Sequence, residues 1–365
     1  MPGRTNFPPF PEDMETHPLV VVDYQLIKAG DKEEAEKLWT AATQLGFWYL
    51  KNHGADEEVD GMFDLGLETM ALSEAEKMKY AETDEGVGYK AAGACVIDEK
   101  GTLDVIEMLN IAKDDILAYP EKVYAEYPRT VNARMEKTLQ PFVRKSVEVS
   151  HALLDALSVK LGLPKGALSQ RHKLEENSTC NARVIKTPPQ PEGWSEEKAL
   201  MAAHTDYGSL TFLHNRLGGL QVLAPGTSKW QYIRPLPGHA ICNVGDSLVL
   251  LSGGILRSNL HRVVPPPGEQ FPLERWSLGY FMRPGDNVPL RALVEDSPMI
   301  AEAVAKTPEK NWDTGVTSKE WAVRRIMFIR AKNFKGKETW MASGGTEDYK
   351  SIERAAGKVV DEVKA

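Results

Sequence analysis

The spacing of apolar residues changes along this chain. From residue 32 to residue 45 the apolar side chains recur every three or four positions, which predicts a helix with one buried stripe. Asp31 precedes this run and is the expected N-cap. From Cys180 to about Arg283, short apolar runs alternate with Gly and Pro, a pattern typical of antiparallel strands. The pattern predicts a mixed α/β fold with a mainly β core.

Further elements are predicted on both sides of this strand-rich segment. Short runs of β-branched and aromatic residues at 19–24, 47–50 and 105–112 predict three strands. Residues 132–161 predict one or two helices, with Pro141 as a kink or break. In the tail, the apolar spacing at 317–329 predicts a helix that packs on the β core, and residues 353–365 are charged and helix-prone.

The most informative stretch is residues 201–213, because it carries His204 and Asp206 two positions apart. In an extended strand such residues point to the same face, so the imidazole and the carboxylate converge. A third ligand is available in His261, which lies in a later strand-like run. Two histidines and one carboxylate that leave coordination positions open are typical of non-haem iron(II) oxygenases.

Other interpretations of these histidines are open from the residues alone. A His-x-Asp pair in a strand is more often packed or hydrogen-bonded than bound to metal. His214 and His239 compete with His261 for the third position, although a histidine after a Pro-Gly turn is usually solvated. His53, in an Asn-His-Gly turn, is expected to be structural.

A second candidate group follows His261 in the next strand-like run, at 274–284. Arg275 and Ser277 share one face of this run. A guanidinium beside a hydroxyl is well suited to bind a carboxylate through two hydrogen bonds. The alternative is an exposed Arg and Ser at the edge of a sheet.

In these motifs the chain resembles the isopenicillin-N-synthase-like family of iron(II)- and 2-oxoglutarate-dependent dioxygenases. The resemblance rests on His204-Thr-Asp206, His261-Arg-Val263 and Arg275-x-Ser277, in this order and at these spacings. It extends over roughly residues 18 to 285, because other segments also match the family: Gly46–Gly54, Gly218–Leu223, Trp230, Pro235–Gly238 and Asn243–Leu248.

The resemblance implies a fold, a set of cofactors and a reaction. The fold would be a double-stranded β-helix, or jelly roll, with supporting helices and with the iron at its mouth. His204, Asp206 and His261 would hold iron(II). The distal carboxylate of 2-oxoglutarate would bind Arg275 and Ser277, and dioxygen would take the last position. The chain would then oxidise a small organic molecule and convert 2-oxoglutarate to succinate and CO2.

The sequence departs from the family at one position near the cosubstrate. Many members carry a Tyr before the prolines that contacts 2-oxoglutarate, and here that place is taken by Thr187. Three further residues are candidates for contact with the substrate: Arg183, which would meet an anionic part of the substrate or cosubstrate, and Tyr207 and Phe281, which adjoin site strands.

Composition and charge limit the other possible functions. The formal charge of −8 argues against nucleic acid as a partner, since binding to phosphates requires a basic face. Three cysteines at no metal-ligand spacing (Cys95, Cys180 and Cys242) argue against a disulfide framework and favour the cytosol. We expect no membrane span and no secretion signal, because no long apolar run occurs. The sequence does not indicate an oligomeric state.

The chain is expected to form one catalytic unit over residues 1–365. Within it we distinguish an N-terminal helix-rich region (18–175), the jelly-roll core with the metal and 2-oxoglutarate site (176–290) and a C-terminal helical extension (291–365). Three alternative functions stay open: an iron(II) oxidase of the same fold that does not use 2-oxoglutarate, a zinc hydrolase or lyase, and a non-catalytic binding protein. A role in secondary metabolism rests on what members of this family commonly do.

Overall fold

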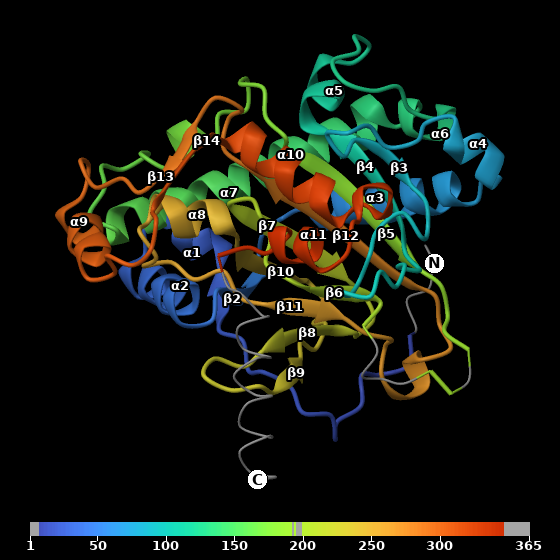
Figure 1. Ribbon diagram of the computed structural model, residues 1–365, viewed down its shortest axis with the longest axis horizontal. Helices are drawn as coiled ribbons and strands as arrows, with labels where there is room; N and C mark the ends of the chain where they lie inside the picture. The colour runs from blue at the N-terminus through green and yellow to red at the C-terminus, as the bar shows by residue number, and fades with distance from the viewer. Residues whose placement is uncertain (1–6, 192, 195–198, 347–365) are drawn as a thin grey trace.

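A computed structural model of the protein describes residues 7–191, 193–194 and 199–346 (Figure 1). Its largest sheet has 8 strands in the order β1-β2-β10-β7-β12-β5-β4-β3, and a second sheet has 4 strands in the order β6-β11-β8-β9. The strands of these two sheets are β1 (Val21–Asp23), β2 (Phe47–Lys51), β3 (Gly88–Lys90), β4 (Glu107–Ala112), β5 (Asn181–Thr187), β6 (Met201–His204), β7 (Leu210–Asn215), β8 (Leu220–Leu223), β9 (Trp230–Tyr232), β10 (His239–Val244), β11 (His261–Val263) and β12 (Arg275–Met282).

Strand β12 shows why the large sheet has one apolar and one functional face. Trp276, Leu278 and Tyr280 point to the face that packs against helices in the main hydrophobic core. The residues that alternate with them, Arg275 and Ser277 among them, point to the opposite face, because side chains alternate along a strand. The candidate residues on β12 therefore lie on the face of the large sheet that points away from these helices, which we call its inner face.

Helices cover the outer face of the large sheet. They include α7, in which Leu153, Leu154 and Leu157 are buried as helical spacing predicts. Pro141 stands in the first turn of α7, where a missing N–H costs no hydrogen bond, and a π-helical turn (Met135–Leu139) precedes it. The helices of the N-terminal region are α1 (Tyr24–Ala29), α2 (Lys32–Gln44), α3 (Asp56–Met70), α4 (Glu74–Met78), α5 (Lys113–Ala118), α6 (Arg129–Asn132) and α7 (Gln140–Lys160).

Several predicted elements are present close to their expected bounds. Asp31 caps α2, where its side chain accepts a hydrogen bond from the backbone N–H of Glu34. The three early strands are found as β1, β2 and β4. Together with β3 they form four of the eight strands of the large sheet, so the first part of the chain completes the sheet that the later strands begin.

The C-terminal extension is not purely helical. Its described part, up to residue 346, contains a small sheet of β13 (Pro289–Arg291) and β14 (Asp313–Thr317). The α-helices described there are α9 (Pro298–Ala305), α10 (Ser318–Ile329) and α11 (Lys337–Ala342), and the short α8 (Asp246–Leu251) lies earlier, in the core. The predicted helix at 317–329 is α10, which begins with a capping box between Thr317 and Glu320. Figure 1 shows α10 and α11 in front of β7 and β12.

The sequence indicates a helix-prone segment at residues 353–365 and no membrane-spanning segment. The proposed helix at 353–365 lies outside the described residues. Within the described ranges, no helix is long and apolar enough to cross a membrane.

Candidate active site

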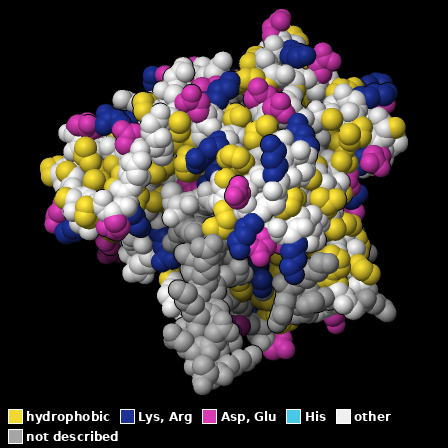
Figure 2. All heavy atoms as spheres, in the orientation of Figure 1, with side chains coloured by type: hydrophobic (Ala, Val, Ile, Leu, Met, Phe, Trp, Pro, Cys, Tyr) yellow, Lys and Arg dark blue, Asp and Glu magenta, His cyan; other side chains and the backbone are white. Residues whose placement is uncertain are grey.

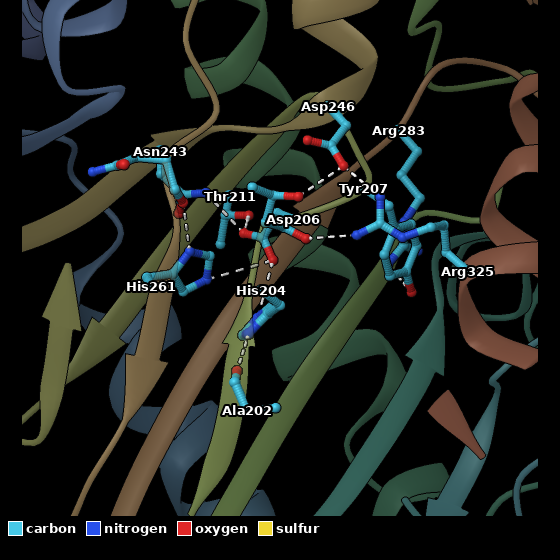
Figure 3. Close-up of polar contacts among 12 residues, drawn as sticks. Ala202, His204, Asp206, Tyr207, Thr211, Asn243, Asp246, His261, Arg283 and Arg325 are labelled. Carbon is cyan, nitrogen blue, oxygen red and sulfur yellow. Dashed lines mark hydrogen bonds and ion pairs between the residues drawn. The ribbon is translucent and has the colours of Figure 1, made fainter. Parts of the chain in front are cut away.

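His204 and His261 meet because their strands pair. In the antiparallel pair of β6 and β11, the two histidines lie directly opposite each other, and their ring centroids are 4.3 Å apart. Asp206 follows two residues after His204, beyond the end of β6. One ligand atom from each of the three side chains lies within 4.8 Å of the others. Figure 3 shows the three side chains pointing toward one another.

The hydrogen bonds of the two imidazoles fix which nitrogen can bind a metal. The Nδ1 of His204 lies 2.8 Å from the carbonyl oxygen of Ala202, and the Nδ1 of His261 lies 3.1 Å from that of Asn259. Since a carbonyl oxygen only accepts, each Nδ1 carries the proton and each Nε2 presents a lone pair. Both Nε2 atoms lie 3.9 Å from Asp206 Oδ1, so three electron-rich atoms converge. This donor set fits a divalent cation.

Two neighbouring side chains hold the other oxygen of Asp206. The Thr211 hydroxyl and the Asn243 amide donate hydrogen bonds to Oδ2, at 2.5 and 2.8 Å. Oδ1 is thereby left to face the histidines. Burial raises the pKa of Asp206, but the two histidines and these two hydrogen bonds outweigh it and bring the pKa to about 2.

The environment of His204 keeps its ring neutral. Burial, together with the nearby His261, lowers the pKa of His204 to about 4. At neutral pH the site therefore offers a neutral imidazole beside an ionised carboxylate. These are the protonation states that metal binding requires.

The other candidate histidines lie elsewhere. His214 is on β7 but points to the face opposite Thr211, where its ring packs against His53 and Phe212. His239 begins β10, and its Nδ1 contacts the carbonyl of Pro237 in the preceding turn. His53 is buried and accepts a hydrogen bond from the backbone N–H of Ala55.

Arg275 is buried without a carboxylate partner among the described residues. It is 2% exposed, and it donates hydrogen bonds to the Gly218 carbonyl (2.7 Å) and to the Ser277 hydroxyl (2.6 Å). Burial lowers its pKa to about 10, so the group remains charged at neutral pH. An unpaired buried cation is costly, and an anionic ligand would compensate it. This geometry fits the distal carboxylate of 2-oxoglutarate.

Thr187 lies on the strand beside Arg275. The two residues are direct cross-strand partners of β5 and β12, so their side chains share the inner face. The Thr187 hydroxyl is buried and has no hydrogen-bond partner among the described residues. Such a group is available to a ligand that would bring an acceptor.

A cavity opens beside His204 and Asp206 and contains the three candidate substrate residues, Arg183, Tyr207 and Phe281. The guanidinium of Arg183 stacks 4.4 Å above the ring of Phe281. The hydroxyl of Tyr207 accepts a hydrogen bond of 3.1 Å from Arg283. The cavity therefore combines two of the candidate metal ligands, His204 and Asp206, with an aromatic and cationic wall.

The sequence prediction missed that the C-terminal extension forms part of this cavity. Arg325 of α10 forms a buried ion pair with Asp246 and donates a hydrogen bond of 3.0 Å to the carbonyl of Thr205, between two candidate ligands. Thr205 also donates a hydrogen bond of 2.9 Å to Asp246. In the sequence, the only indication of this contact is an arginine, Arg325, within the predicted helix at 317–329. No local pattern shows which carboxylate this arginine pairs with.

The surface around this region has mixed charge. Figure 2 shows Lys and Arg side chains interspersed with Asp and Glu side chains on the face that carries α10 and α11. The net negative charge of the chain is therefore not concentrated on this face.

Known protein families match both the N-terminal region and the β core of this chain. Residues 176–284 match the 2OG-Fe(II) oxygenase superfamily, and residues 19–131 match the N-terminal region of non-haem dioxygenases named for morphine synthesis. The 2-oxoglutarate-dependent dioxygenase frbH of Dothideomycetidae sp. (strain 11243) is 31% identical over 282 residues, which cover 75% of this chain and 84% of the relative. The chain belongs to the 2-oxoglutarate- and iron(II)-dependent dioxygenases.

A second relative and a solved structure agree with this assignment. A 2-oxoglutarate-dependent dioxygenase of Aspergillus fumigatus is 28% identical over 345 residues, which cover 87% of this chain and 88% of the relative. The crystal structure of a full-length Neurospora crassa protein in complex with alpha-KG has a TM-score of 0.71 and 22% identity, over 87% of this chain and 97% of that one. The predicted double-stranded β-helix fold is thus confirmed.

Family membership also establishes the enzyme class and the cofactors. The protein is a dioxygenase that uses iron(II) and 2-oxoglutarate. The alternatives of a zinc hydrolase or lyase, of a non-catalytic binding protein and of an oxidase without 2-oxoglutarate are set aside.

Proposed function

We propose that His204, Asp206 and His261 hold the iron(II) of this dioxygenase. The observation that carries the proposal is the convergence of two Nε2 lone pairs on Asp206 Oδ1, at 3.9 Å each. Electron-rich atoms repel one another at this separation unless a cation lies among them. Thr211 and Asn243 support the proposal, because they bind the oxygen of Asp206 that faces away from the histidines.

We further propose that Arg275, Ser277 and Thr187 hold the distal carboxylate of 2-oxoglutarate. The guanidinium is buried, charged and without a carboxylate partner in the described part of the chain. Ser277 and Thr187 share its face of the sheet, so their hydroxyls could donate hydrogen bonds to the same carboxylate. Arg275 would neutralise one negative charge of the cosubstrate and orient it toward the iron.

The side chains around the iron act by orientation and exclusion of water. Iron(II) and 2-oxoglutarate held by these residues would supply the activation of dioxygen and the oxidation of a substrate C–H bond, with release of succinate and CO2. The two Nδ1–H groups keep both imidazole rings turned toward the metal by bonding to Ala202 and Asn259. No protein nucleophile is needed for this reaction.

The substrate is proposed to bind in the cavity against Arg183, Tyr207 and Phe281. It would be a small organic molecule, and the outcome is hydroxylation, desaturation, cyclisation or ring expansion according to the position of the reacting carbon. A role in secondary metabolism, a cytosolic location, and the absence of nucleic-acid and membrane partners stay predictions from the sequence.

Anaerobic titration of the protein with iron(II) and then 2-oxoglutarate tests the assignment of the ligands. We expect a visible charge-transfer band that requires both additions, followed by formation of succinate when oxygen is admitted. His261→Ala should weaken iron binding by more than the roughly 10–100-fold that loss of an outer partner of a metal ligand costs. The matched control is His239→Ala, since that histidine begins β10, contacts the preceding turn and is outside the cluster.

The ligand assignment would be wrong if His261→Ala bound iron as the wild type does. An equal loss of iron binding in His261→Ala and His239→Ala would show that removal of either histidine weakens iron binding, and it would not support His261 as a ligand. For the cosubstrate site, Arg275→Met should abolish the band at 2-oxoglutarate concentrations that saturate the wild type, while iron binding measured without 2-oxoglutarate stays intact.

A further inference from the structure

The cavity beside the metal ligands has more positive side chains than its carboxylates can balance. Among the described residues that line it, three cations have a carboxylate within ion-pair distance: Lys90 pairs with Asp104, Arg325 with Asp246 and Arg330 with Glu82. Two further cations that line the cavity, Arg183 and Arg283, have no ion pair in the described part of the chain.

The iron and the cosubstrate would not supply the missing negative charge. This step rests on the function proposed above. The two positive charges of iron(II) and that of Arg275 balance the charge of Asp206 and the two carboxylates of 2-oxoglutarate. Glu82 lies close enough to Arg183 for their charges to interact, but it is already paired with Arg330. The lining therefore keeps an excess of positive charge from Arg183 and Arg283 in the loaded enzyme, and this excess would favour an anionic substrate.

Arg183 is the better placed of the two for direct contact. Its Nε donates a hydrogen bond of 2.5 Å to Asn110 Oδ1, and its guanidinium stacks on Phe281. These contacts hold the plane of the group, whereas its two terminal nitrogens have no acceptor among the described residues. The terminal nitrogens of Arg283 are occupied by the Thr179 carbonyl and the Tyr207 hydroxyl.

The position of Arg183 also sets the size of the substrate. Arg183 on β5 pairs with Gly279 on β12, which pairs with Leu213 on β7, two residues beyond Thr211. Two strand spacings separate Arg183 from the strand that contacts Asp206, which is roughly 10 Å. Apolar side chains of the cavity lie between the two ends, among them Ile106, Met108 and Phe281.

We propose that the substrate is a small, largely apolar organic acid whose carboxylate binds the terminal nitrogens of Arg183. Its apolar part would lie against Phe281 and Met108, which places a carbon several bonds from the carboxylate next to the iron. A planar guanidinium with two free nitrogens on one side matches a carboxylate through paired hydrogen bonds.

A panel of aromatic, alicyclic and aliphatic monocarboxylates, each with its methyl ester and primary amide, tests this inference. Binding is measured by calorimetry on the metal-free protein and by the change that each compound causes in the anaerobic iron(II)–2-oxoglutarate band. We expect acids to bind and their esters and amides to bind much more weakly. Arg183→Gln should weaken binding of the acids by roughly 10–100-fold, as loss of a charge-assisted hydrogen bond does, and leave the KM for 2-oxoglutarate within twofold of the wild type.

Arg216→Gln is the matched control. Arg216 also stacks on a phenylalanine, Phe63, at 4.4 Å, but it pairs with the exposed Asp60 and is not part of the cavity lining. The inference fails if no acid of the panel binds, if esters bind as well as acids, or if Arg183→Gln binds acids as the wild type does. A large rise in the KM for 2-oxoglutarate in Arg183→Gln would instead assign Arg183 to the cosubstrate. If the iron(II)–2-oxoglutarate band does not form in the wild type, the proposed function is contradicted. The inference about the substrate class is then judged by calorimetry on the metal-free protein.

Discussion

Thr187 stands where many members of the family carry a tyrosine, and its hydroxyl is buried without a partner among the described residues. A buried, unpaired hydroxyl lowers stability, so its presence here is best explained by a ligand that completes its hydrogen bonding. Thr187 pairs with Arg275 across β5 and β12, which places the hydroxyl beside the proposed carboxylate site. The hydroxyl is therefore placed to donate a hydrogen bond to a carboxylate that Arg275 binds.

Thr187→Val separates this role from packing, because valine keeps the shape and replaces the hydroxyl with a methyl group. We expect the KM for 2-oxoglutarate to rise roughly 10–100-fold, the effect of losing one hydrogen bond to a charged group. The melting temperature of the ligand-free protein should be unchanged or higher, since an unpaired buried polar group is removed. Thr187→Ser keeps the hydroxyl and is the control. An unchanged KM in Thr187→Val would show that this residue does not contact the cosubstrate.

At the level of single residues, the sequence predicted what depends on local geometry. The two-residue spacing of His204 and Asp206 places both on one face of any extended segment, so their proximity follows from the strand alone. The choice of His261 over His214 required the family resemblance, because only the register of β6 with β11 brings it opposite His204. The roles of Thr211 and Asn243 were not predictable, since they depend on the packing of β7 beside β10.

At the level of elements, α10 connects the C-terminal extension to the strand that carries the candidate ligands. Arg325 in α10 is 4% exposed and Asp246 is 0% exposed, and the two form an ion pair. Thr346 donates a hydrogen bond of 2.6 Å to the other oxygen of Asp246. The chain passes so close here that a Cβ at Gly345 would collide with the Thr205 hydroxyl. The extension is therefore packed directly against the segment between His204 and Asp206.

Removal of Arg325 should destabilise the protein strongly, because the Asp246 carboxylate would stay buried without its counter-ion. For Arg325→Met we expect a loss of about 3–5 kcal/mol in the free energy of unfolding, measured with urea. The neighbouring Arg324 is exposed and stacks on Trp321, so Arg324→Met provides the same substitution with an expected effect of at most about 1 kcal/mol. The double variant Arg325→Met with Asp246→Asn should recover part of the loss. Equal stability of the two methionine variants would contradict this account.

Elements with a strong local signal were predicted well, and elements that depend on tertiary contacts were not. The helix at 32–45 has both a cap and a regular apolar stripe, and the structure has α2 at Lys32–Gln44. In contrast, β13 and β14 are short, and the chain between them includes α9, so no local pattern marks their pairing. The same holds for the π-helical turn before α7, where the register of the helix changes.

At the level of the whole molecule, the candidate metal ligands belong to a sheet system that the N-terminal region, residues 18–175, completes. Four of the eight strands in the large sheet come from this region. Strand β2 pairs with β10, and β4 pairs with β5, so the N-terminal strands cover both edges of the core strands. The predicted boundary at residue 175 therefore separates regions that share one sheet, and the predicted boundary at residue 290 falls inside β13. Residues from all three regions belong to one hydrophobic core.

The segment 176–290 should accordingly not fold by itself, although it contains every residue proposed to bind iron and 2-oxoglutarate. Without the N-terminal region, β10 and β5 become open edges that invite association with other chains. The outer face of β12 would lose its cover of helices and expose Trp276, Leu278 and Tyr280 to water. We expect the isolated segment to aggregate and to show no cooperative thermal transition by circular dichroism, whereas residues 7–346 melt cooperatively. A cooperative transition in the isolated segment, with iron binding, would show that the β core is an independent domain and that the other regions only refine its cavity.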